Sequence, residues 1–116
     1  MKLKELFKKT EQRNTCSAVI VAAGSAQRMG ADKVMLELGC MPVLARTLLA
    51  FQNCDAIDEI IVVTRMDKVE EVASLCKKYG VTKAGKVIRG GKTRMESALA
   101  GVSEVRSNAK LIAIHD

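Results

Sequence analysis

The apolar residues of this chain fall into two patterns, short continuous runs and longer stretches with helical spacing. Runs rich in Val, Ile and Ala follow Cys16 and Ile57, and another precedes His115. Such continuous runs are typical of parallel strands that are buried on both faces. A shorter, less apolar segment lies before the glycine pair at 90–91. We therefore predict strands at 18–23, 57–64, 86–88 and 111–114.

Apolar residues recur at helical spacing in the intervals between these strands. Pro42 suits a first helical position because that position needs no N–H donor. Asp67 with Glu70, and Thr93 with Glu96, have the spacing of a capping box. The predicted helices cover about 42–53, 67–80 and 93–105. Their apolar stripes are Leu44, Leu48 and Phe51, then Val69, Val72, Ala73 and Cys76, and then Met95, Ala98, Leu99, Val102 and Val105.

Strands and helices thus alternate along the chain, with a glycine-containing loop after the first strand. The connections are long enough for right-handed crossovers between parallel strands. We expect an α/β fold with a doubly wound, mostly parallel sheet. A length of 116 residues suits one domain. We divide the chain into a basic N-terminal extension, 1–15, and a domain that covers 16–116.

Composition narrows the kinds of partner that we expect. Half of the net charge of +6 lies in residues 1–15, and the remaining basic residues are interspersed with acidic ones. Aromatic residues, which stack single-stranded bases, make up only 3% of the chain. We therefore expect an anionic small substrate and no nucleic acid. No apolar run approaches the roughly 20 residues of a membrane span, and no secretory signal is evident, so we expect a cytoplasmic protein.

Cysteine and methionine are expected to serve packing rather than chemistry. The four cysteines are Cys16, Cys40, Cys54 and Cys76. They form no CxxC pair, so we expect reduced, mostly packed thiols and no thiolate metal site. We interpret the six methionines, including Met29 and Met95, as core residues.

Three unusual segments follow the ends of predicted strands, at 24–33, at 90–97 and at Asp116. Parallel α/β sheets bind ligands beyond the carboxyl ends of their strands. In the first segment, the glycine allows close approach of a ligand to the backbone, and Arg28 and Lys33 add two cations suited to phosphate. Each residue alone would also fit a plain turn or a solvated loop. Their convergence at one edge of the sheet favours a phosphate-binding site.

Two common phosphate-binding loops do not fit the first segment. The dinucleotide fingerprint needs glycines where this chain has Gly24, Ala26 and Met29. The Walker loop needs adjacent Gly and Lys, and here Ala31 and Asp32 separate that pair.

A third pattern does fit. The segment AVIVAAGSAQRMGADK resembles the strand, Ala-Ala-Gly, Arg-Met-Gly and Lys signature of nucleotidyltransferases that activate sugars or sugar alcohols. VIRGGKTRMESA and IHD resemble the Gly-Gly-x-x-Arg-x-x-Ser and His-Asp motifs of the 2-C-methyl-D-erythritol 4-phosphate cytidylyltransferases. The resemblance covers about 17–116. It implies a Rossmann-like nucleotidyltransferase fold with its carboxy-terminal half missing, so that 16–116 is an incomplete CTP-binding domain.

The resemblance also implies roles for the residues of the three motifs. Arg28 and Lys33 would contact the triphosphate and act in catalysis, and Asp116 would bind Mg²⁺. The residues that would line the nucleotide are Ala22, Ala23, Gly24 and Ser25. Those that would hold cytosine and ribose are Gly90, Gly91 and Ser97.

The implied reaction transfers CMP from CTP to 2-C-methyl-D-erythritol 4-phosphate and releases pyrophosphate, as a step of isoprenoid precursor synthesis by the non-mevalonate pathway. Another polyol phosphate, such as ribitol 5-phosphate, is an alternative acceptor. A nucleotide-binding module without turnover is an alternative of a different class, because the second half of the family's domain is absent. We expect this chain alone to be inactive, and a homodimer for the full-length protein.

Some positions depart from the family's pattern or allow a purely structural reading. Ala26 stands at a frequent glycine, Asp32 at a frequent proline, and Lys92 at a position that is often acidic. We interpret Arg94 as tying the glycine turn to the helix start, and His115 as a packed neighbour of the aspartate. We also expect instability or self-association of the isolated chain, because the last strand would leave an apolar edge uncovered.

Overall fold

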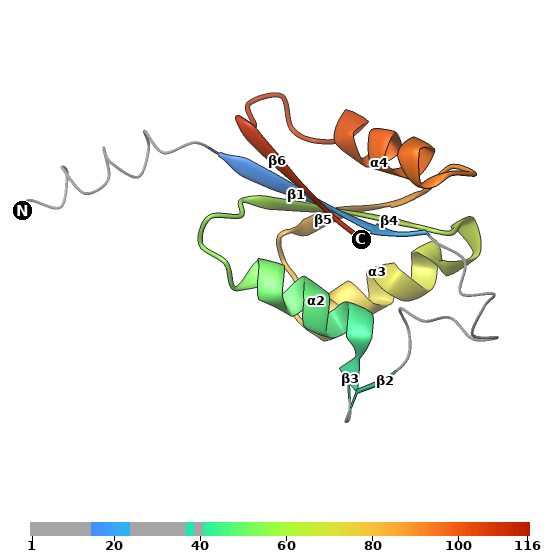
Figure 1. Ribbon diagram of the computed structural model, residues 1–116. Coiled ribbons are helices and arrows are strands. Elements are labelled where there is room, and N and C mark those ends of the chain that lie inside the picture. The colour runs from blue at the N-terminus through green and yellow to red at the C-terminus, as the bar shows by residue number, and fades with distance from the viewer. Residues whose placement is uncertain (1–14, 24–36, 39–40) are drawn as a thin grey trace, which may run out of the picture.

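The computed structural model describes residues 15–23, 37–38 and 41–116 (Figure 1). Most of the predicted extension 1–15 lies outside this part, as do Gly24, Ser25, Arg28 and Lys33. The elements are β1 (Cys16–Ala22), β2 (Glu37–Leu38), β3 (Met41–Pro42), α2 (Val43–Gln52), β4 (Glu59–Thr64), the 3₁₀ helix η3 (Met66–Lys68), α3 (Val69–Lys78), β5 (Ala84–Arg89), α4 (Arg94–Ser103) and β6 (Leu111–His115).

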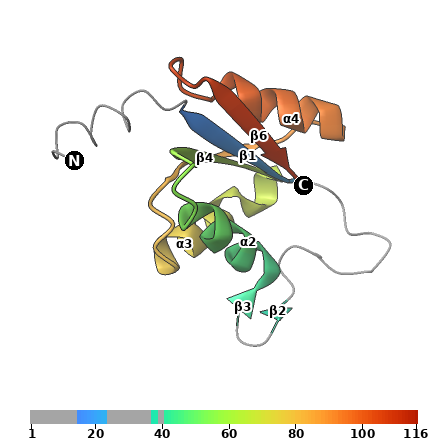
Figure 2. The same ribbon diagram turned by 60° about the vertical axis from the view of Figure 1, so that its left-hand side comes forward.

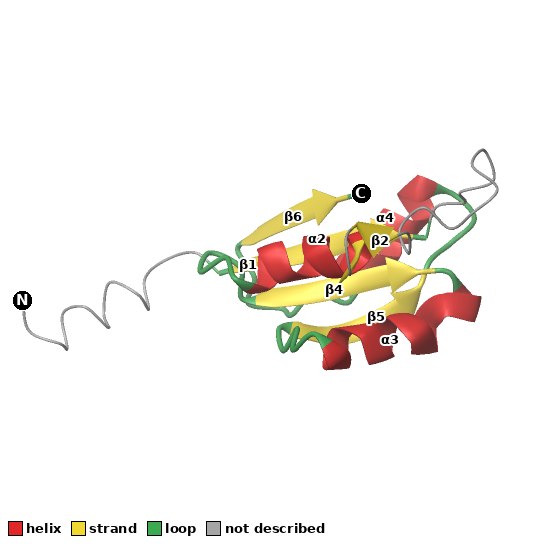
Figure 3. Ribbon diagram, turned by 90° about the horizontal axis from the view of Figure 1, so that it is seen from below, coloured by secondary structure: helices red, strands yellow, loops and turns green. Residues whose placement is uncertain are grey.

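The four predicted strands form one parallel sheet, with the order β5-β4-β1-β6 (Figure 3). The chain runs outward from β1 to β4 and β5, and then returns to the other side of β1 to form β6. The α/β fold with a parallel, Rossmann-like sheet is therefore confirmed. The strand order changes direction between β1 and β6, which makes the carboxyl ends of these two strands a switch point. A short antiparallel pair, β2 with β3, was not predicted.

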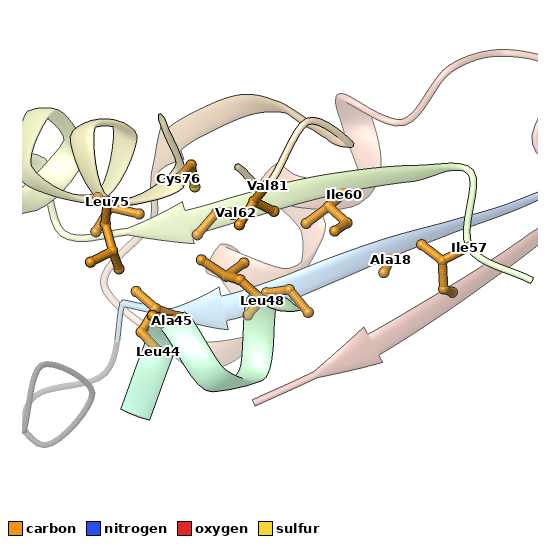
Figure 4. Close-up of a cluster of buried hydrophobic side chains, with 13 residues drawn as sticks. Ala18, Leu44, Ala45, Leu48, Ile57, Ile60, Val62, Leu75, Cys76 and Val81 are labelled. Atoms are coloured by element: carbon orange, nitrogen blue, oxygen red, sulfur yellow. The ribbon is translucent and has the colours of Figure 1, made fainter. Parts of the chain in front are cut away.

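Helices cover both faces of the sheet, with α2 and α3 on one face and α4 on the other (Figures 1 and 2). The side chains of β1 point alternately to the two faces of the sheet. Ala18 and Ile20 belong to the core under α2 and α3, whereas Val19 and Val21 belong to the core under α4. Figure 4 shows the first of these cores, where Leu48 of α2 lies among the side chains of the sheet. β1 and β4 are thus buried on both faces, as predicted.

The predicted apolar stripe of α4 is partly wrong. Ala98, Val102 and Val105 pack against the sheet, but Met95 and Leu99 are exposed. The helix lies very close to the sheet, because a Cβ on Gly101 would collide with Val19 and come within 2.9 Å of Val63. The smaller residues of α4, such as Ala98 and Gly101, therefore contact the sheet. The larger apolar side chains, Met95 and Leu99, point outward. The interpretation of Met95 as a core residue is corrected by the same observation.

The beginnings of α2 and α3 also differ from the predictions. Pro42 is the N-cap of α2 and not its first helical residue. Asp67 does not cap α3, since its carboxylate accepts two hydrogen bonds from Arg65, at 3.2 and 3.1 Å. A local ion pair thus replaces the expected cap. α3 ends at Lys78, and the predicted glycine stop, Gly80, follows its C-cap Tyr79 with a φ of 69°, a left-handed conformation that favours glycine.

The prediction of mostly packed thiols holds for two of the three cysteines that the structure describes. Cys76 is buried in the core and the half-buried Cys16 packs against it, whereas Cys54 is exposed. Burial in the core raises the pKa of the Cys76 thiol, so this side chain remains a protonated, apolar group near neutral pH.

A buried carboxylate ties the amino ends of β1 and β4 to the loop before β6. Glu59 accepts hydrogen bonds from the Ser17 hydroxyl at 2.8 Å and from the Arg106 N–H at 3.0 Å. Its second oxygen lies 3.6 Å from Nε of Arg106. Burial opposes ionisation, but these hydrogen bonds and the positive charge of Arg106 together hold the pKa of Glu59 below its usual value. This cluster lies at the opposite end of the strands from the switch point.

Candidate functional site

A cavity of about 360 Å³ lies at the switch point, beyond the carboxyl ends of β1 and β6. It is lined by Val21, Ala23, Gly91, Lys92, Thr93, Arg94, Ser97 and Asp116. These residues come from the end of β1, the turn between β5 and α4, the first turn of α4, and the residue after β6. The position is the one at which open parallel sheets bind ligands.

The glycine turn reaches β1 because Gly90 has no side chain. Its N–H donates to the carbonyl of Thr64 at 2.8 Å, which extends the ladder between β4 and β5 by one bond. A Cβ on Gly90 would collide with the Ser97 hydroxyl and would lie 2.7 Å from Cβ of Ala23. The turn, α4 and the end of β1 therefore meet at one point, which has room only for glycine.

The first turn of α4 is fixed by three hydrogen bonds. The hydroxyl of Thr93 accepts from the N–H of Glu96 at 3.1 Å, so the predicted N-cap is confirmed. The carboxylate of Glu96 accepts from the N–H of Lys92 at 2.6 Å, one residue before the donor of a standard capping box. The hydroxyl of Ser97 accepts from the N–H of Gly91 at 3.1 Å. These bonds hold the backbone of the turn in place at the cavity.

Arg94 and Asp116 face one another across the mouth of the cavity. Nε of Arg94 donates to Oδ1 of Asp116 at 3.0 Å, and Nη2 of Arg94 forms an ion pair with Oδ2. The arginine therefore binds the aspartate, and the interpretation that it ties the glycine turn to the helix is wrong. Glu96 and Ser97 make that connection instead. Both side chains are exposed, so the pair contributes no more than about 1 kcal/mol to stability.

Four of the sequence-predicted site residues line the cavity, namely Ala23, Gly91, Ser97 and Asp116. Gly90 lies directly behind them, against Ser97 and Ala23. The side chain of Ala22 belongs to the core under α2 on the other face of the sheet, so only its backbone is near the cavity. Four further predicted site residues lie outside the part of the chain that the structure describes, namely Gly24, Ser25, Arg28 and Lys33.

Sequence reasoning missed part of the cavity wall. Val21, Thr93, Arg94 and Lys92 also line it. The position of Arg94 one helical turn before Ser97 was a usable signal, because residues three apart on a helix share a face. His115 points to the opposite face of the sheet, where its ring centroid lies 5.4 Å from that of Phe51.

The charges around the cavity favour an anion. Lys92 and Arg94 contribute two cations to its wall, against the single carboxylate of Asp116. In the part of the chain that the structure describes, no group of three or more His, Cys, Asp or Glu side chains could hold a metal ion. A metal at Asp116 would therefore need further ligands from a bound substrate or from water.

A second hollow, of about 540 Å³, lies beside η3 and the end of β5. Its lining residues are Met66, Asp67, Val69, Glu70 and Arg89. It has two carboxylates against one arginine and no glycine turn, so it suits an anionic ligand less well. The cavity at the switch point is the better candidate site.

Comparison with known proteins identifies the family. The family model described as 2-C-methyl-D-erythritol 4-phosphate cytidylyltransferase matches residues 16–116. The curated protein of that name from Clostridium botulinum (strain ATCC 19397 / Type A) is 37% identical over 102 residues, which cover 86% of this chain and 44% of the relative. The corresponding protein from Halalkalibacterium halodurans is 38% identical over 102 residues, with the same coverage of 86% and 44%.

A solved structure agrees with the sequence comparisons. The 4-diphosphocytidyl-2C-methyl-D-erythritol synthase from Anaerococcus prevotii DSM 20548 is 30% identical and superposes with a TM-score of 0.74. The match covers 89% of this chain and 43% of that one. The chain thus spans less than half the length of each of these three relatives. By its sequence and its fold, it belongs to the 2-C-methyl-D-erythritol 4-phosphate cytidylyltransferase family.

Proposed function

We propose that this chain provides the nucleotide-binding part of a cytidylyltransferase that transfers CMP from CTP to 2-C-methyl-D-erythritol 4-phosphate. Pyrophosphate is the second product, and the reaction belongs to isoprenoid precursor synthesis. One observation carries the proposal: in a member of this family, the glycine turn, Ala23 and Asp116 meet at one cavity, at the switch point of a parallel sheet.

The cavity wall offers the groups that a nucleoside needs. Gly90 and Gly91 let the turn lie tightly against α4, because a Cβ at either position would collide with that helix. In this proposal the base and ribose lie against the backbone of this turn. The hydroxyl of Ser97 accepts from Gly91, and its own O–H can donate to an oxygen of the base or the ribose. Gly90, Gly91 and Ser97 therefore hold the cytidine in this proposal, and Ala22, Ala23, Gly24 and Ser25 line the nucleotide.

Magnesium fits the lone carboxylate at the mouth of the cavity. Mg²⁺ in nucleotide enzymes is usually held by one or two carboxylates together with substrate phosphates and water. When bound, it neutralises charge on the phosphate oxygens. Both oxygens of Asp116 interact with Arg94, so the aspartate would have to exchange this partner to hold the ion. The forked donors of Arg94 would then suit a phosphate oxygen at the same mouth.

Catalysis in this proposal depends on charge rather than on proton transfer. A phosphate oxygen of the acceptor attacks the α-phosphorus of CTP, and pyrophosphate leaves on the opposite side. Negative charge accumulates on the nonbridging and leaving oxygens. Arg28 and Lys33, which follow β1 in the AVIVAAGSAQRMGADK segment, stabilise that charge together with backbone N–H groups.

We also propose that the protein acts in the cytoplasm and that the full-length enzyme is a homodimer. No helix among the described residues is long and apolar enough to cross a membrane.

Calorimetric titration with CTP tests the binding half of this proposal. Replacing Ser97 by Ala removes the buried hydroxyl and should weaken CTP binding about tenfold, in line with the loss of one or two hydrogen bonds. Ser74→Ala, at an exposed position on α3, is the matched control and should leave the affinity unchanged. Absence of CTP binding, or equal affinities for both variants and the parent chain, would count against the site.

Pyrophosphate release tests the reaction. It is measured with CTP, Mg²⁺ and either 2-C-methyl-D-erythritol 4-phosphate or ribitol 5-phosphate, on a polypeptide that joins this chain to the remaining part of the Clostridium botulinum relative. Release with the first acceptor is expected. Pyrophosphate release only with ribitol 5-phosphate would show that this compound is the acceptor. CTP binding without any pyrophosphate release would indicate a nucleotide-binding module.

A further inference from the structure

Two strands and a loop meet at Glu59, at the amino end of the sheet. Glu59 begins β4 and is only 8% exposed. One of its carboxylate oxygens accepts from the Ser17 hydroxyl at 2.8 Å and from the Arg106 N–H at 3.0 Å. Ser17 is a buried residue of β1, and Arg106 lies in the loop 104–110, which leads from α4 into β6. We call Glu59, Ser17 and Arg106 the β6 anchor.

The β6 anchor connects the loop before β6 to a strand that is not a neighbour of β6. In the sheet order β5-β4-β1-β6, β1 lies between β4 and β6. Ser17 of β1 is the register partner of Glu59 on one side and of Ile112 on the other. The loop is therefore fixed to a central strand of the sheet, in addition to the strand with which β6 pairs.

Burial of apolar side chains selects the register of β6 only weakly. Leu111, Ile112 and Ile114 lie on both faces of the strand, and their exposed fractions are 53%, 42% and 53%. A strand specifies its register strongly where one of its faces is buried. In the described part of the chain, β6 is an edge strand that pairs only with β1 (Figure 2). A polar contact at the start of β6 therefore has more influence on register than it would in β1 or β4.

Other side chains that contact this loop do so in water. The hydroxyl of Thr15 donates to the carbonyl of Asn108 at 2.7 Å, and Nζ of Lys86 donates to the carbonyl of Glu104 at 2.9 Å, both in exposed positions. Water can replace an exposed hydrogen bond, whereas a buried donor that loses its partner carries a desolvation penalty. Because Glu59 is shielded from water, its contacts hold the loop more firmly than the exposed ones do.

The register of β6 determines where Asp116 lies. The last residue of β6, His115, is the register partner of Ile20, and Asp116 follows it directly. A parallel strand rises about 3.3 Å per residue, so a slip of two residues would keep the faces of β6 and move Asp116 by about 6.6 Å. A displacement of that size would take the carboxylate away from the cavity that it lines.

The contact that holds Asp116 at the cavity itself is exposed. It is the ion pair with Arg94, and in the proposed function Asp116 exchanges this partner when it holds an ion. The β6 anchor lies at the other end of the strands and uses no group of the cavity wall. It can therefore hold β6 in register whether or not Arg94 remains bound to the aspartate.

We infer that Glu59 is a positioning residue for Asp116. By accepting hydrogen bonds from Ser17 and Arg106, it fixes the register of β6 on β1, and with it the place of the aspartate at the mouth of the cavity. The register depends on the geometry of the β6 anchor alone. Its importance for metal binding rests on the proposed function.

Substitutions at Glu59 separate its hydrogen bonds from its volume and its charge. Glu59→Leu fills a similar volume and accepts no hydrogen bond, whereas Glu59→Gln keeps a carbonyl oxygen that can accept from both donors. Leu75→Ala is the matched control, because it creates a cavity in the core on the other face of the sheet and so lowers stability away from the β6 anchor. Circular dichroism establishes that each variant folds.

Nuclear Overhauser contacts between backbone protons of β1 and β6 report the register directly. The parent chain, Glu59→Gln and Leu75→Ala should show the contacts of the register pair Val19 and Ile114. Glu59→Leu should lose these contacts or show a shifted set. Mn²⁺ binding, followed by electron paramagnetic resonance, should weaken about tenfold in Glu59→Leu and change less than about twofold in the other two variants.

Ser17→Ala is the second variant if Glu59→Leu does not fold. It keeps the carboxylate and removes the hydroxyl that orients it, so it should weaken the same contacts and Mn²⁺ binding to a smaller extent. Unchanged contacts between β1 and β6 in the folded variants that lack these hydrogen bonds would overturn the inference.

Equal losses in Leu75→Ala or in Glu59→Gln would also overturn the inference, because instability or charge would then be the cause. Altered contacts with unchanged Mn²⁺ binding would show that the register does not position Asp116 for the metal. A parent chain that binds no Mn²⁺ would count against the proposed function, and the contacts between β1 and β6 would still decide whether Glu59 positions the strand.

Discussion

Replacing Gly90 by alanine should distort the candidate site and destabilise the domain. The added Cβ would collide with the hydroxyl of Ser97 and lie 2.7 Å from Cβ of Ala23, well inside ordinary van der Waals contact. Neither neighbour can retreat easily, because Ser97 is on a helix packed against the sheet and the Cβ of Ala23 is fixed to the end of β1. Overpacking of this kind costs about 1–3 kcal/mol.

Gly85→Ala is the matched control, since it adds the same methyl group to β5 where no atom lies within 4 Å. Neither glycine has a positive φ, so the available space alone separates the two variants. Unfolding in urea, followed by circular dichroism, gives the free energies. We expect Gly85→Ala to be neutral or slightly stabilising, and Gly90→Ala to lose the stated 1–3 kcal/mol and to bind CTP more weakly.

A double variant provides a further check on the cause. In Gly90→Ala/Ser97→Ala the hydroxyl is gone but the contact with Ala23 remains. Part of the stability lost in Gly90→Ala, and not all of it, should therefore return. Equal stabilities for the Gly90 and Gly85 variants would refute the close meeting of β1, the glycine turn and α4.

Two further predictions concern charged groups. The pKa of Glu59 is lower in the folded chain than in the unfolded one, so the stabilisation it provides is complete above the usual glutamate pKa and is lost as the pH falls through the depressed value. Glu59→Gln should reduce this loss in urea unfolding measured between neutral and acid pH, and an unchanged pH dependence would contradict it. Arg94→Gln should tighten Mn²⁺ binding at Asp116 without nucleotide up to about fivefold, as judged by electron paramagnetic resonance, because the ion pair no longer competes. Unchanged or weaker Mn²⁺ binding would contradict a competing role for the arginine.

The sequence was sufficient to predict the features that depend on local pattern. The run from Ala18 predicted a doubly buried strand, because every residue of such a strand meets a core on one face or the other. Thr93 predicted the start of α4, because an N-cap involves only residues within one helical turn. The order of strands and helices then placed Asp116 and the glycine turn at the same edge of the sheet.

The errors arose where distant or competing partners decide the outcome. Periodicity marked Met95 and Leu99 as apolar positions of a helix, but it could not show that the helix covers β1 and β4 and leaves β6 open. Asp67 had the spacing of an N-cap for α3, yet its carboxylate binds Arg65 instead of the helix backbone. Arg94 meets an aspartate 22 positions along the chain, a pairing that only the tertiary structure reveals.

Amide chemical shifts followed during a titration with CTP test the central claim most directly. The account predicts saturable changes at the amides of Ala23, Gly91 and Ser97, which surround the cavity at the switch point. The amide of Gly85, on β5, should remain unchanged. Shifts that centre on Met66 and the hollow beside η3, or the absence of any saturable shift, would contradict the assignment of the nucleotide to the switch point.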